Sequence, residues 1–189
     1  LALLTGALIG CQTYGEGAGL GGLLGAGAGA IIGNQSGHAV EGALIGAGVG
    51  ALAGLIAHDI KAKKQRDAAA AAAAHPTYQP SQGLQIISED QSVAPTRVGP
   101  GNEIETTFTY SVLGSGGGVQ VTETRILLQG DRVVNRFNAA TFNRDDGTWY
   151  STQSFRLPNN MAPGQYAVVT EVRASNLSIQ STPMPFTVS

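Results

Sequence analysis

The stretch NEIETTFTYSV, from Asn102 to Val112, alternates apolar or β-favouring residues with polar ones. One alternating set consists of Ile104, Thr106, Phe108, Tyr110 and Val112. Because successive side chains of a strand point to opposite faces, this period of two predicts an antiparallel strand that is buried on one face. The same period begins near Leu84 and continues downstream.

Five further stretches have the composition of strands. They are GVQVTETRILLQ, RVVNRF, GTWYSTQSFRL, GQYAVVTEVRA and LSIQSTPMPFTV. Turn-forming residues bound them at 114–118, 129–131, 145–147, 163–164 and 175–176. About seven short strands in roughly 105 residues predict a β-sandwich over residues 84–189.

The stretch APGQYAVVTEV resembles the end of an immunoglobulin-like domain, where a tyrosine opens the penultimate strand at a corner. The resemblance assigns the corner to Tyr166 and turns Val168 and Val172 inward. We expect Trp149 and Phe155 to face the same core. Since the domain has no cysteine pair, it departs from the antibody pattern and resembles disulfide-free envelope versions, whose core must supply the stability.

The predicted sandwich has few residues that commonly carry out catalysis. All three histidines, His38, His58 and His75, lie outside residues 84–189, as does the only cysteine, Cys11. The domain therefore lacks the parts of a Ser-His-Asp triad, a Cys-His pair or a histidine-cysteine zinc site. We expect no enzymatic activity, no metal and no cofactor.

Two ligand sites remain open in this domain. Asn143, Asp145 and Asp146 offer oxygens to a calcium ion, although NRDDG first predicts a hairpin turn. The arginines offer a second possibility, docking of a phosphorylated glycolipid or acidic glycan, which the acids of the same domain oppose. Those considered are Arg125, Arg132, Arg136, Arg144, Arg156 and Arg173.

The composition changes sharply before the sandwich. Every lysine of the protein lies within HDIKAKKQRD, residues 58–67. The alanine run from Ala68 to Ala74 favours a helix that ends at His75-Pro76. We therefore predict a helical extension and linker over residues 61–83, continuous with a helix from Gly42 and about 50 Å long. The basic run lacks interleaved aromatic residues, so no nucleic acid partner is expected.

Further upstream, glycine recurs every four residues in two series. The first is Gly17, Gly21, Gly25, Gly29 and Gly33, and the second is Gly42, Gly46, Gly50 and Gly54. Residues four apart share one helix face, so each series forms a stripe without side chains. In lipid, such stripes allow helix backbones to pack closely. The two series predict a self-associating membrane hairpin over residues 11–60.

Other interpretations of the glycines remain. The two segments would rise roughly 25 and 28 Å, close to the ~30 Å hydrocarbon core of a bilayer. A soluble helical hairpin packed on a partner, or a flexible glycine-alanine tract, also fits the composition. The spelling Gly17-x-Gly19-x-x-Gly22 matches a dinucleotide-binding loop, but it lacks the preceding strand and the acidic ribose partner.

The apolar run LALLTGALIG leads into Cys11. Leu8-Ile9-Gly10-Cys11 resembles the lipobox at which lipoprotein signal peptides are cut. Residues 1–10 would then be the remnant of a signal peptide, and Cys11 would be lipid-modified. Gln12 in place of aspartate resembles an outer-membrane address. The alternative is a small apolar cysteine within a third membrane helix.

The paired glycine series resembles the glycine zipper domain of bacterial envelope lipoproteins, a group that includes the rickettsial 17 kDa surface antigen. The resemblance covers roughly residues 11–60. Together with the strand pattern and the immunoglobulin-like resemblance further along the chain, it implies an α + β multidomain protein, with a membrane helical hairpin followed by an all-β immunoglobulin-like sandwich.

The predicted function follows from this organisation. The protein is expected to be a lipid-anchored scaffold of the bacterial envelope, in the outer membrane, that self-associates and displays a binding module. Expected partners are membrane lipid, further copies of the chain, and envelope proteins or glycans. The alternatives are a pore formed by a ring of hairpins, a secreted filament subunit, and an enzyme of unusual mechanism.

Overall fold

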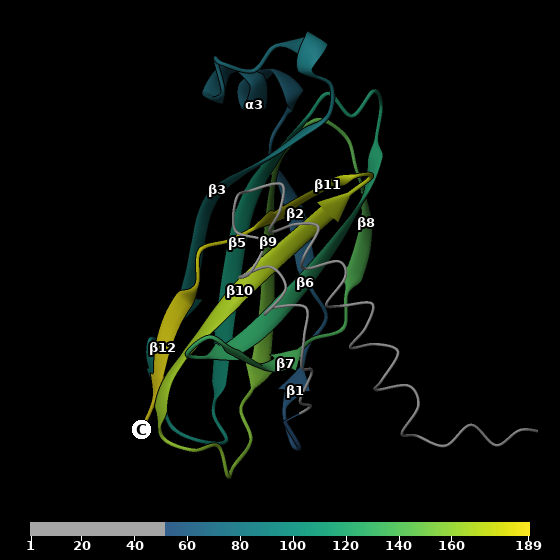
Figure 1. The fold of residues 1–189 in the computed structure, drawn as a ribbon. Coiled ribbons are helices and arrows are strands. Elements are labelled where there is room, and N and C mark those ends of the chain that lie inside the picture. The colour runs from purple at the N-terminus through teal and green to yellow at the C-terminus, as the bar shows by residue number, and fades with distance from the viewer. Residues whose placement is uncertain (1–51) are drawn as a thin grey trace, which may run out of the picture.

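Two β-sheets face each other in the computed structural model, which describes residues 52–189 (Figure 1). Sheet A contains β3 (Gln85–Ala94), β5 (Glu103–Leu113) and β9 (Gly147–Arg156), with β5 in the middle. Two consecutive segments share the remaining edge of β9. They are β1 (Ile56–Ala57) and β2 (Lys61–Arg66).

Sheet B has the strand order β4-β12-β10-β6-β7. These strands are β4 (Arg97–Val98), β12 (Met184–Val188), β10 (Gly164–Ala174), β6 (Val119–Gln129) and β7 (Arg132–Arg136). In addition, β8 (Ala140–Arg144) pairs with β6 and β11 (Leu177–Gln180) pairs with β10. Only β4 and β12 are parallel among the described strands. The chain thus forms the two-sheet sandwich that its period of two predicts.

The core lies between the two sheets, and β5 supplies its centre. The five alternating residues of this strand are at most 1% exposed, which confirms the predicted buried face. Apolar residues from β6, β9, β10 and β12 complete the core around them. Phe137 and Phe155 pack with their ring centroids 4.6 Å apart.

A tyrosine marks the start of β10, as predicted. The hydroxyl of Tyr166 donates a hydrogen bond to the carbonyl oxygen of Ala162, four residues earlier, at 2.9 Å. Val168 and Val172 are fully buried, and so is Phe155. Trp149 is only half-buried and packs against one end of the core, with its Nε1 donating to the Asp145 carbonyl at 3.1 Å.

The segment before the sandwich differs from its prediction. Residues 61–66 form the edge strand β2 instead of a helix, paired with β9 from Lys61 opposite Thr152 to Arg66 opposite Thr148. The helix is confined to α3 (Ala68–Ala74), whose N-terminus is capped by the Asp67 side chain. The predicted 50 Å helix through residues 42–74 is therefore wrong over residues 56–66.

The physical reason is that tertiary pairing overrides local propensity. Without β2, most of one edge of β9 would leave its backbone groups without strand partners. Ile60 anchors the segment, being 8% exposed, and Leu52 and Leu55 pack against the core. Gly147 allows the close crossing, because a Cβ there would lie 2.6 Å from the Arg66 carbonyl oxygen. Residues 56–57 and 61–66, upstream of the predicted sandwich, are thus part of sheet A.

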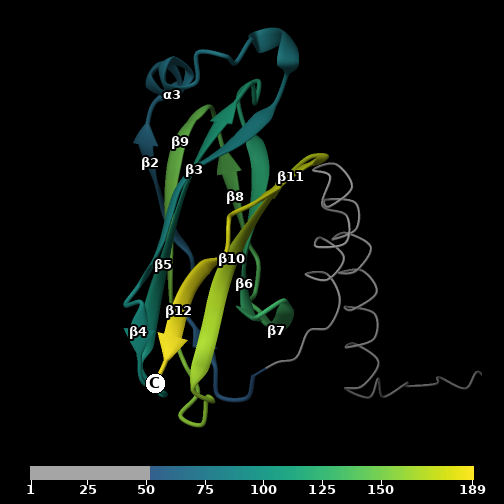
Figure 2. The same cartoon turned by 60° about the vertical axis from the view of Figure 1, so that its left-hand side comes forward.

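The two ends of the sandwich carry different elements (Figure 2). The C-terminus and β1 lie at one end, where the described chain begins. α3 and the 3-10 helix η1 (Pro80–Gln82) lie at the opposite end, so β2 carries the chain along the length of the sandwich and β3 brings it back.

Candidate functional site

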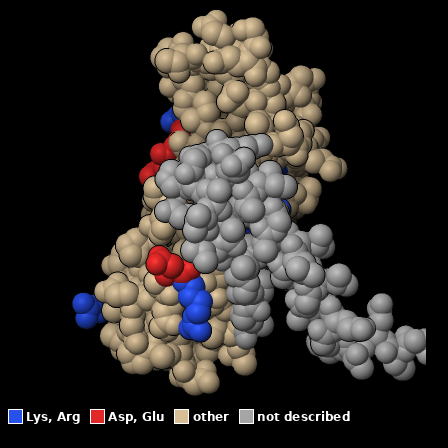
Figure 3. Space-filling view, viewed as in Figure 1, with Lys and Arg blue, Asp and Glu red and all other residues tan. Residues whose placement is uncertain are grey.

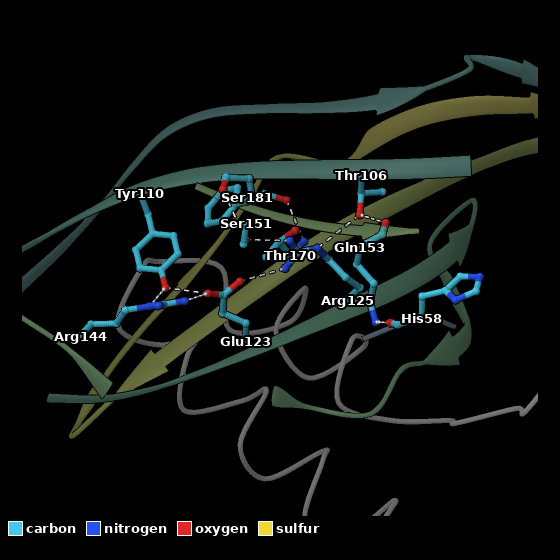
Figure 4. Close-up of polar contacts among 11 residues, drawn as sticks. His58, Thr106, Tyr110, Glu123, Arg125, Arg144, Ser151, Gln153, Thr170 and Ser181 are labelled. Atoms are coloured by element: carbon cyan, nitrogen blue, oxygen red, sulfur yellow. Dashed lines mark hydrogen bonds and ion pairs between the residues drawn. The ribbon is translucent and has the colours of Figure 1, made fainter. Parts of the chain in front are cut away.

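A group of polar side chains lies inside the sandwich, here called the inner cluster (Figure 4). Its members are Tyr110 from β5, Glu123 and Arg125 from β6, and Arg144 from β8. The Tyr110 hydroxyl donates to Glu123 Oε1 at 2.6 Å, and Arg144 Nη2 donates to the same oxygen at 3.3 Å. Because Tyr110 belongs to sheet A and the other three to sheet B, the cluster links the sheets.

Arg125 is fully buried in this cluster. Its Nη1 lies 3.4 Å from Glu123 Oε2, and its Nη2 donates to Ser151 Oγ at 2.9 Å. Burial lowers the pKa of Arg125, while the neighbouring Glu123 carboxylate opposes the change. Burial raises the pKa of the Tyr110 phenol, and Glu123 raises it further, so Tyr110 stays a hydrogen-bond donor.

Two guanidinium groups face one carboxylate in the inner cluster. The second guanidinium, that of Arg144, lies over the aromatic rings of Phe142 and Trp149, whose centroids are 4.2 and 4.3 Å from its Cζ. Ring faces carry partial negative charge and therefore stabilise the extra cation. The charged groups of this cluster bind one another, and the Arg144 side chain is only 5% exposed. This arrangement suits a structural role.

A second polar group, the outer cluster, lies on the face of sheet A that points away from sheet B. Arg66 Nη1 is 2.7 Å from Glu89 Oε2, and His75 Nε2 is 3.0 Å from Glu89 Oε1. Ser111 Oγ and Thr148 Oγ1 also donate to Glu89 Oε1. The base on β2, the residue that caps α3 and the two strand hydroxyls are thus held by one carboxylate.

The geometry of two strands brings Glu89 and Arg66 together. The pairing of β3 with β5 shifts register between Ser88 and Asp90, and that of β2 with β9 shifts between Lys64 and Arg66. Such bulges re-aim side chains. Burial raises the pKa of Glu89, but hydrogen bonds from Ser111, His75 and Arg66 outweigh it and hold the pKa below its ordinary value.

A shallow pocket of about 230 Å³ opens on the same outer face of sheet A. Its lining residues, which define the lysine-tyrosine pocket, are Lys61, Ala62, Lys63, Tyr150 and Thr152. The Nζ of Lys63 lies 5.3 Å from the centroid of the Tyr150 ring. Of the three sites, this one alone presents both cations and an aromatic ring to solvent.

The predicted packing and lipidation residues fall mostly outside the described chain. Cys11 and the glycines from Gly17 to Gly50 lie there. Gly54 is described, and it is not on a helix. Its φ of +86° is in the left-handed region, and Leu55 N donates to the Leu52 carbonyl oxygen at 3.2 Å to close a turn. The prediction that Gly54 packs one helix against another is therefore wrong.

The six arginines considered as ligands do not form one surface. Arg125 and Arg144 are inside the sandwich, whereas Arg136 and Arg173 lie 3.0 and 2.8 Å from Glu171. Arg132 donates to Gln129 and Arg156 is exposed. On the visible part of the face in Figure 3, acidic and basic side chains lie in small separate groups without a continuous basic patch.

The NRDDG stretch is not the predicted hairpin turn, because it connects β8 of sheet B to β9 of sheet A and these two strands do not pair with each other. Asp146 accepts hydrogen bonds from the backbone N–H groups of Gly114 and Ser115, at 3.1 and 2.7 Å. Asp145 lies 2.7 Å from Lys64 Nζ. Among residues 52–189, no three histidine, cysteine or carboxylate side chains gather to hold a metal ion.

The inner and outer clusters were absent from the sequence expectations. The alternation within β6 contains a signal for the inner cluster. Glu123 and Arg125 fall on the same alternating face as the buried Val121 and Leu127. The second has no local signal, because Glu89 and its partners come from four separate elements and a linker. His75 was considered only as the end of a helix.

A known protein family matches the first third of the chain. The model of the YMGG-like Gly-zipper family matches residues 1–61. A glycine zipper in this segment is consistent with association with a membrane or the cell envelope. The match ends at Lys61, the first residue of β2. No curated protein matches the chain.

Several solved structures are similar to part of the chain at low sequence identity. The alkylpurine DNA glycosylase AlkC of Pseudomonas fluorescens, bound to DNA containing an abasic site analog, is 14% identical with a TM-score of 0.38, over 57% of this chain and 31% of that one. A β-glucosidase of Erythrobacter marinus is 10% identical with a TM-score of 0.42, over 56% and 16%. This chain therefore spans less than a third of either protein.

A Niemann-Pick type C2 protein from the Japanese carpenter ant is 12% identical, with a TM-score of 0.43, over 57% of this chain and 96% of that one. These likenesses carry no assignment of function. Within the described residues, no helix is both long and apolar enough to cross a bilayer.

Proposed function

We propose that the chain is a membrane-anchored envelope protein whose glycine zipper self-associates and whose sandwich serves as a binding module. The observation that carries this proposal is the junction at Lys61, where the family match ends and β2 begins. The match also includes β1, so the end of the matched segment is already paired into sheet A. Self-association through the first part would therefore hold several sandwiches close together.

The anchor has two components in this proposal. Lipid attached at Cys11 would hold the chain at the outer membrane, since each buried CH₂ contributes ~0.8 kcal/mol. The glycine stripes would then pack helices from neighbouring copies in the bilayer. A Cys11→Ser variant should lose the mass of the lipid at the mature N-terminus. An unlipidated wild-type N-terminus that retains residues 1–10 would overturn this part.

The sandwich is proposed to be immunoglobulin-like and to bind rather than to catalyse. Three features support this assignment: the β3-β5-β9 sheet against the β12-β10-β6 sheet, the parallel β4-β12 pair, and the Tyr166 bond to Ala162. The carboxylates of both polar clusters are engaged by neighbouring side chains. The lysine-tyrosine pocket on the outer face is the proposed contact region.

Crosslinking in membranes tests the zipper. Wild-type chain should give a discrete oligomer or a ladder, whereas replacing both Gly25 and Gly29 with leucine should shift it to monomer without releasing it from membranes. The matched control replaces Ala26 and Ala30 with leucine, which places the same side chains about 100° around the helix and adds one carbon fewer at each site. Equal crosslinking in the wild type and the glycine variant would refute packing through the stripe.

The same samples distinguish a scaffold from a pore. Dye-loaded vesicles containing the wild-type chain should stay tight while the crosslinked oligomer is present. Leakage that the Gly25→Leu, Gly29→Leu variant abolishes would instead establish the pore.

A further inference from the structure

We propose that the lysine-tyrosine pocket binds an acidic polysaccharide, with a sugar ring on Tyr150 and its anionic group between Lys61 and Lys63. This inference rests on the proposed binding role of the sandwich and names its ligand class. It follows from three features of the outer face of sheet A: uncompensated charge, an accessible aromatic ring and a row of hydroxyls.

The charge of the pocket is uncompensated within the described chain. Lys64 and Arg66, on the same strand, each pair with a carboxylate at 2.7 Å. Lys61 and Lys63 are exposed and form no ion pair with any residue of 52–189. Two neighbouring cations without a counter-ion attract anions to the pocket.

Asp59, two residues before Lys61, forms no ion pair with either lysine, and the acids of sheet A on this face are set back from the pocket. Asp90 lies in the same cross-strand row as Lys63, with Tyr150 and Thr109 between them. Three strand spacings of about 4.8 Å place it roughly 14 Å away, beyond the ~8 Å screening length of physiological salt. Glu105 is on β5, opposite Ser154 of β9. Neither acid belongs to the pocket lining.

The ring and the hydroxyls select a sugar over a simple anion. Tyr150 is half-buried and lines the pocket, with Lys63 Nζ 5.3 Å from its ring centroid. A row of hydroxyls leads away from Lys61 across the sheet through Thr152, Thr107 and Ser92. Ser92 Oγ and Thr107 Oγ1 are 2.8 Å apart. Hydroxyls spaced by the strand separation can exchange hydrogen bonds with a polyhydroxyl chain.

The lysines also protect an exposed strand edge, since charged residues discourage edge-to-edge pairing. Edge protection alone needs neither the aromatic ring nor the hydroxyl row. It also treats Lys63 and Lys64 alike, because both are on β2. The two lysines nevertheless point to opposite faces of the strand, and Lys64 is bound to Asp145. This difference gives a matched control.

The test measures binding of the purified full chain, in detergent, to polygalacturonate and to its neutral methyl ester. Lys63→Gln should weaken polygalacturonate binding by roughly tenfold, as expected for one charge-assisted contact, and Lys64→Gln should change it less than about twofold. Tyr150→Ala should weaken binding of both polymers. The wild-type chain should prefer the charged polymer, and added salt should reduce that preference.

Three outcomes would overturn the proposal: no binding of polygalacturonate by the wild type, equal losses in Lys63→Gln and Lys64→Gln, or equal binding of the methyl ester. Vesicles of phosphatidylglycerol form a separate arm. If they bind in a Lys63-dependent way and displace polygalacturonate, the ligand is a lipid phosphate and the glycan assignment fails. Crosslinking of each sample in parallel reports whether the zipper oligomer is intact, so a failure of the proposed function is seen separately.

Discussion

The inner and outer clusters use similar groups in different surroundings. Each is centred on one carboxylate that faces two basic side chains, but Glu123 is fully buried whereas the Glu89 side chain is 13% exposed. The inner partners come from strands of the sandwich itself. The outer partners Arg66 and His75 come from the segment that precedes it. The inner cluster therefore fixes the two sheets to each other, and the outer cluster fixes the incoming chain, residues 52–83, to the rest of sheet A.

Removing the incoming chain should have the largest effect. A fragment of residues 84–189 lacks β1, β2 and α3, and with them both bases of the outer cluster, while all four members of the inner cluster remain. The exposed edge of β9 should then cause aggregation or loss of cooperative unfolding. A fragment of residues 52–189 should unfold cooperatively. Circular dichroism and size-exclusion chromatography compare the two.

Identical thermal midpoints for the two fragments would show that the inner cluster and its core suffice. In that case β2 would add a strand to sheet A without contributing to the stability of the fold.

Neutralising the inner carboxylate should have the next largest effect. Glu123→Gln leaves two buried guanidinium groups without a counter-charge, which is expected to lower the free energy of unfolding by about 3–5 kcal/mol. Urea unfolding of the 52–189 fragment measures this change.

The control for Glu123→Gln removes the charges together. The triple variant Glu123→Leu, Arg125→Met, Arg144→Met should be more stable than Glu123→Gln, because no unpaired charge remains. A triple variant that is less stable than the single one would show that hydrogen bonding and packing, more than charge balance, set the role of the inner cluster.

The sequence predicts the sandwich well where a pattern is local. The alternation in β5 and the position of Tyr166 each depend on a single stretch of chain, and the structure confirms both. β2 could not be predicted in this way, because the residues that make it a strand lie in β9, some 90 positions downstream in the pairing of Lys61 with Thr152.

The candidate sites show the same limit. Glu123 lies between Thr122 and Thr124, so the local pattern around it does not show which face of β6 is inside. Only the longer register, from Val121 to Leu127, places the charges in the core. Tyr150 lies in a predicted strand, but its proximity to Lys63 depends on the unpredicted pairing with β2.

Removing one hydroxyl from the inner cluster should have an intermediate effect. Tyr110→Phe deletes the donor to Glu123 Oε1 and the acceptor for Arg144 Nε, which lies 3.2 Å away. Leaving buried polar groups unsatisfied costs about 1–3 kcal/mol. The matched variant is Ser111→Ala, at the next residue, which removes one donor from the part-exposed Glu89. Its smaller cost in urea unfolding would support the comparison, and an equal or larger cost would contradict it.

The smallest effect is expected from the outer carboxylate, and it should depend on pH. The pKa of Glu89 is below its ordinary value of 4.5, so the folded state binds its proton less readily than the unfolded state. Its contribution is therefore fully present above pH 4.5 and is lost as the pH falls through the lower folded value. Glu89→Gln should cost about 1 kcal/mol at neutral pH, and this difference should shrink in acid. Urea unfolding at a series of pH values from about 7 to about 3 measures it. The control is Asp90→Asn, at the exposed neighbour, which should leave the acid dependence in place. Asp145 and Asp146, whose pKa values are also lowered, should preserve part of the dependence of the unfolding free energy on pH in both variants. A difference between wild type and Glu89→Gln that stays constant with pH would mean that the outer cluster holds the incoming chain by packing and not through the ionised carboxylate.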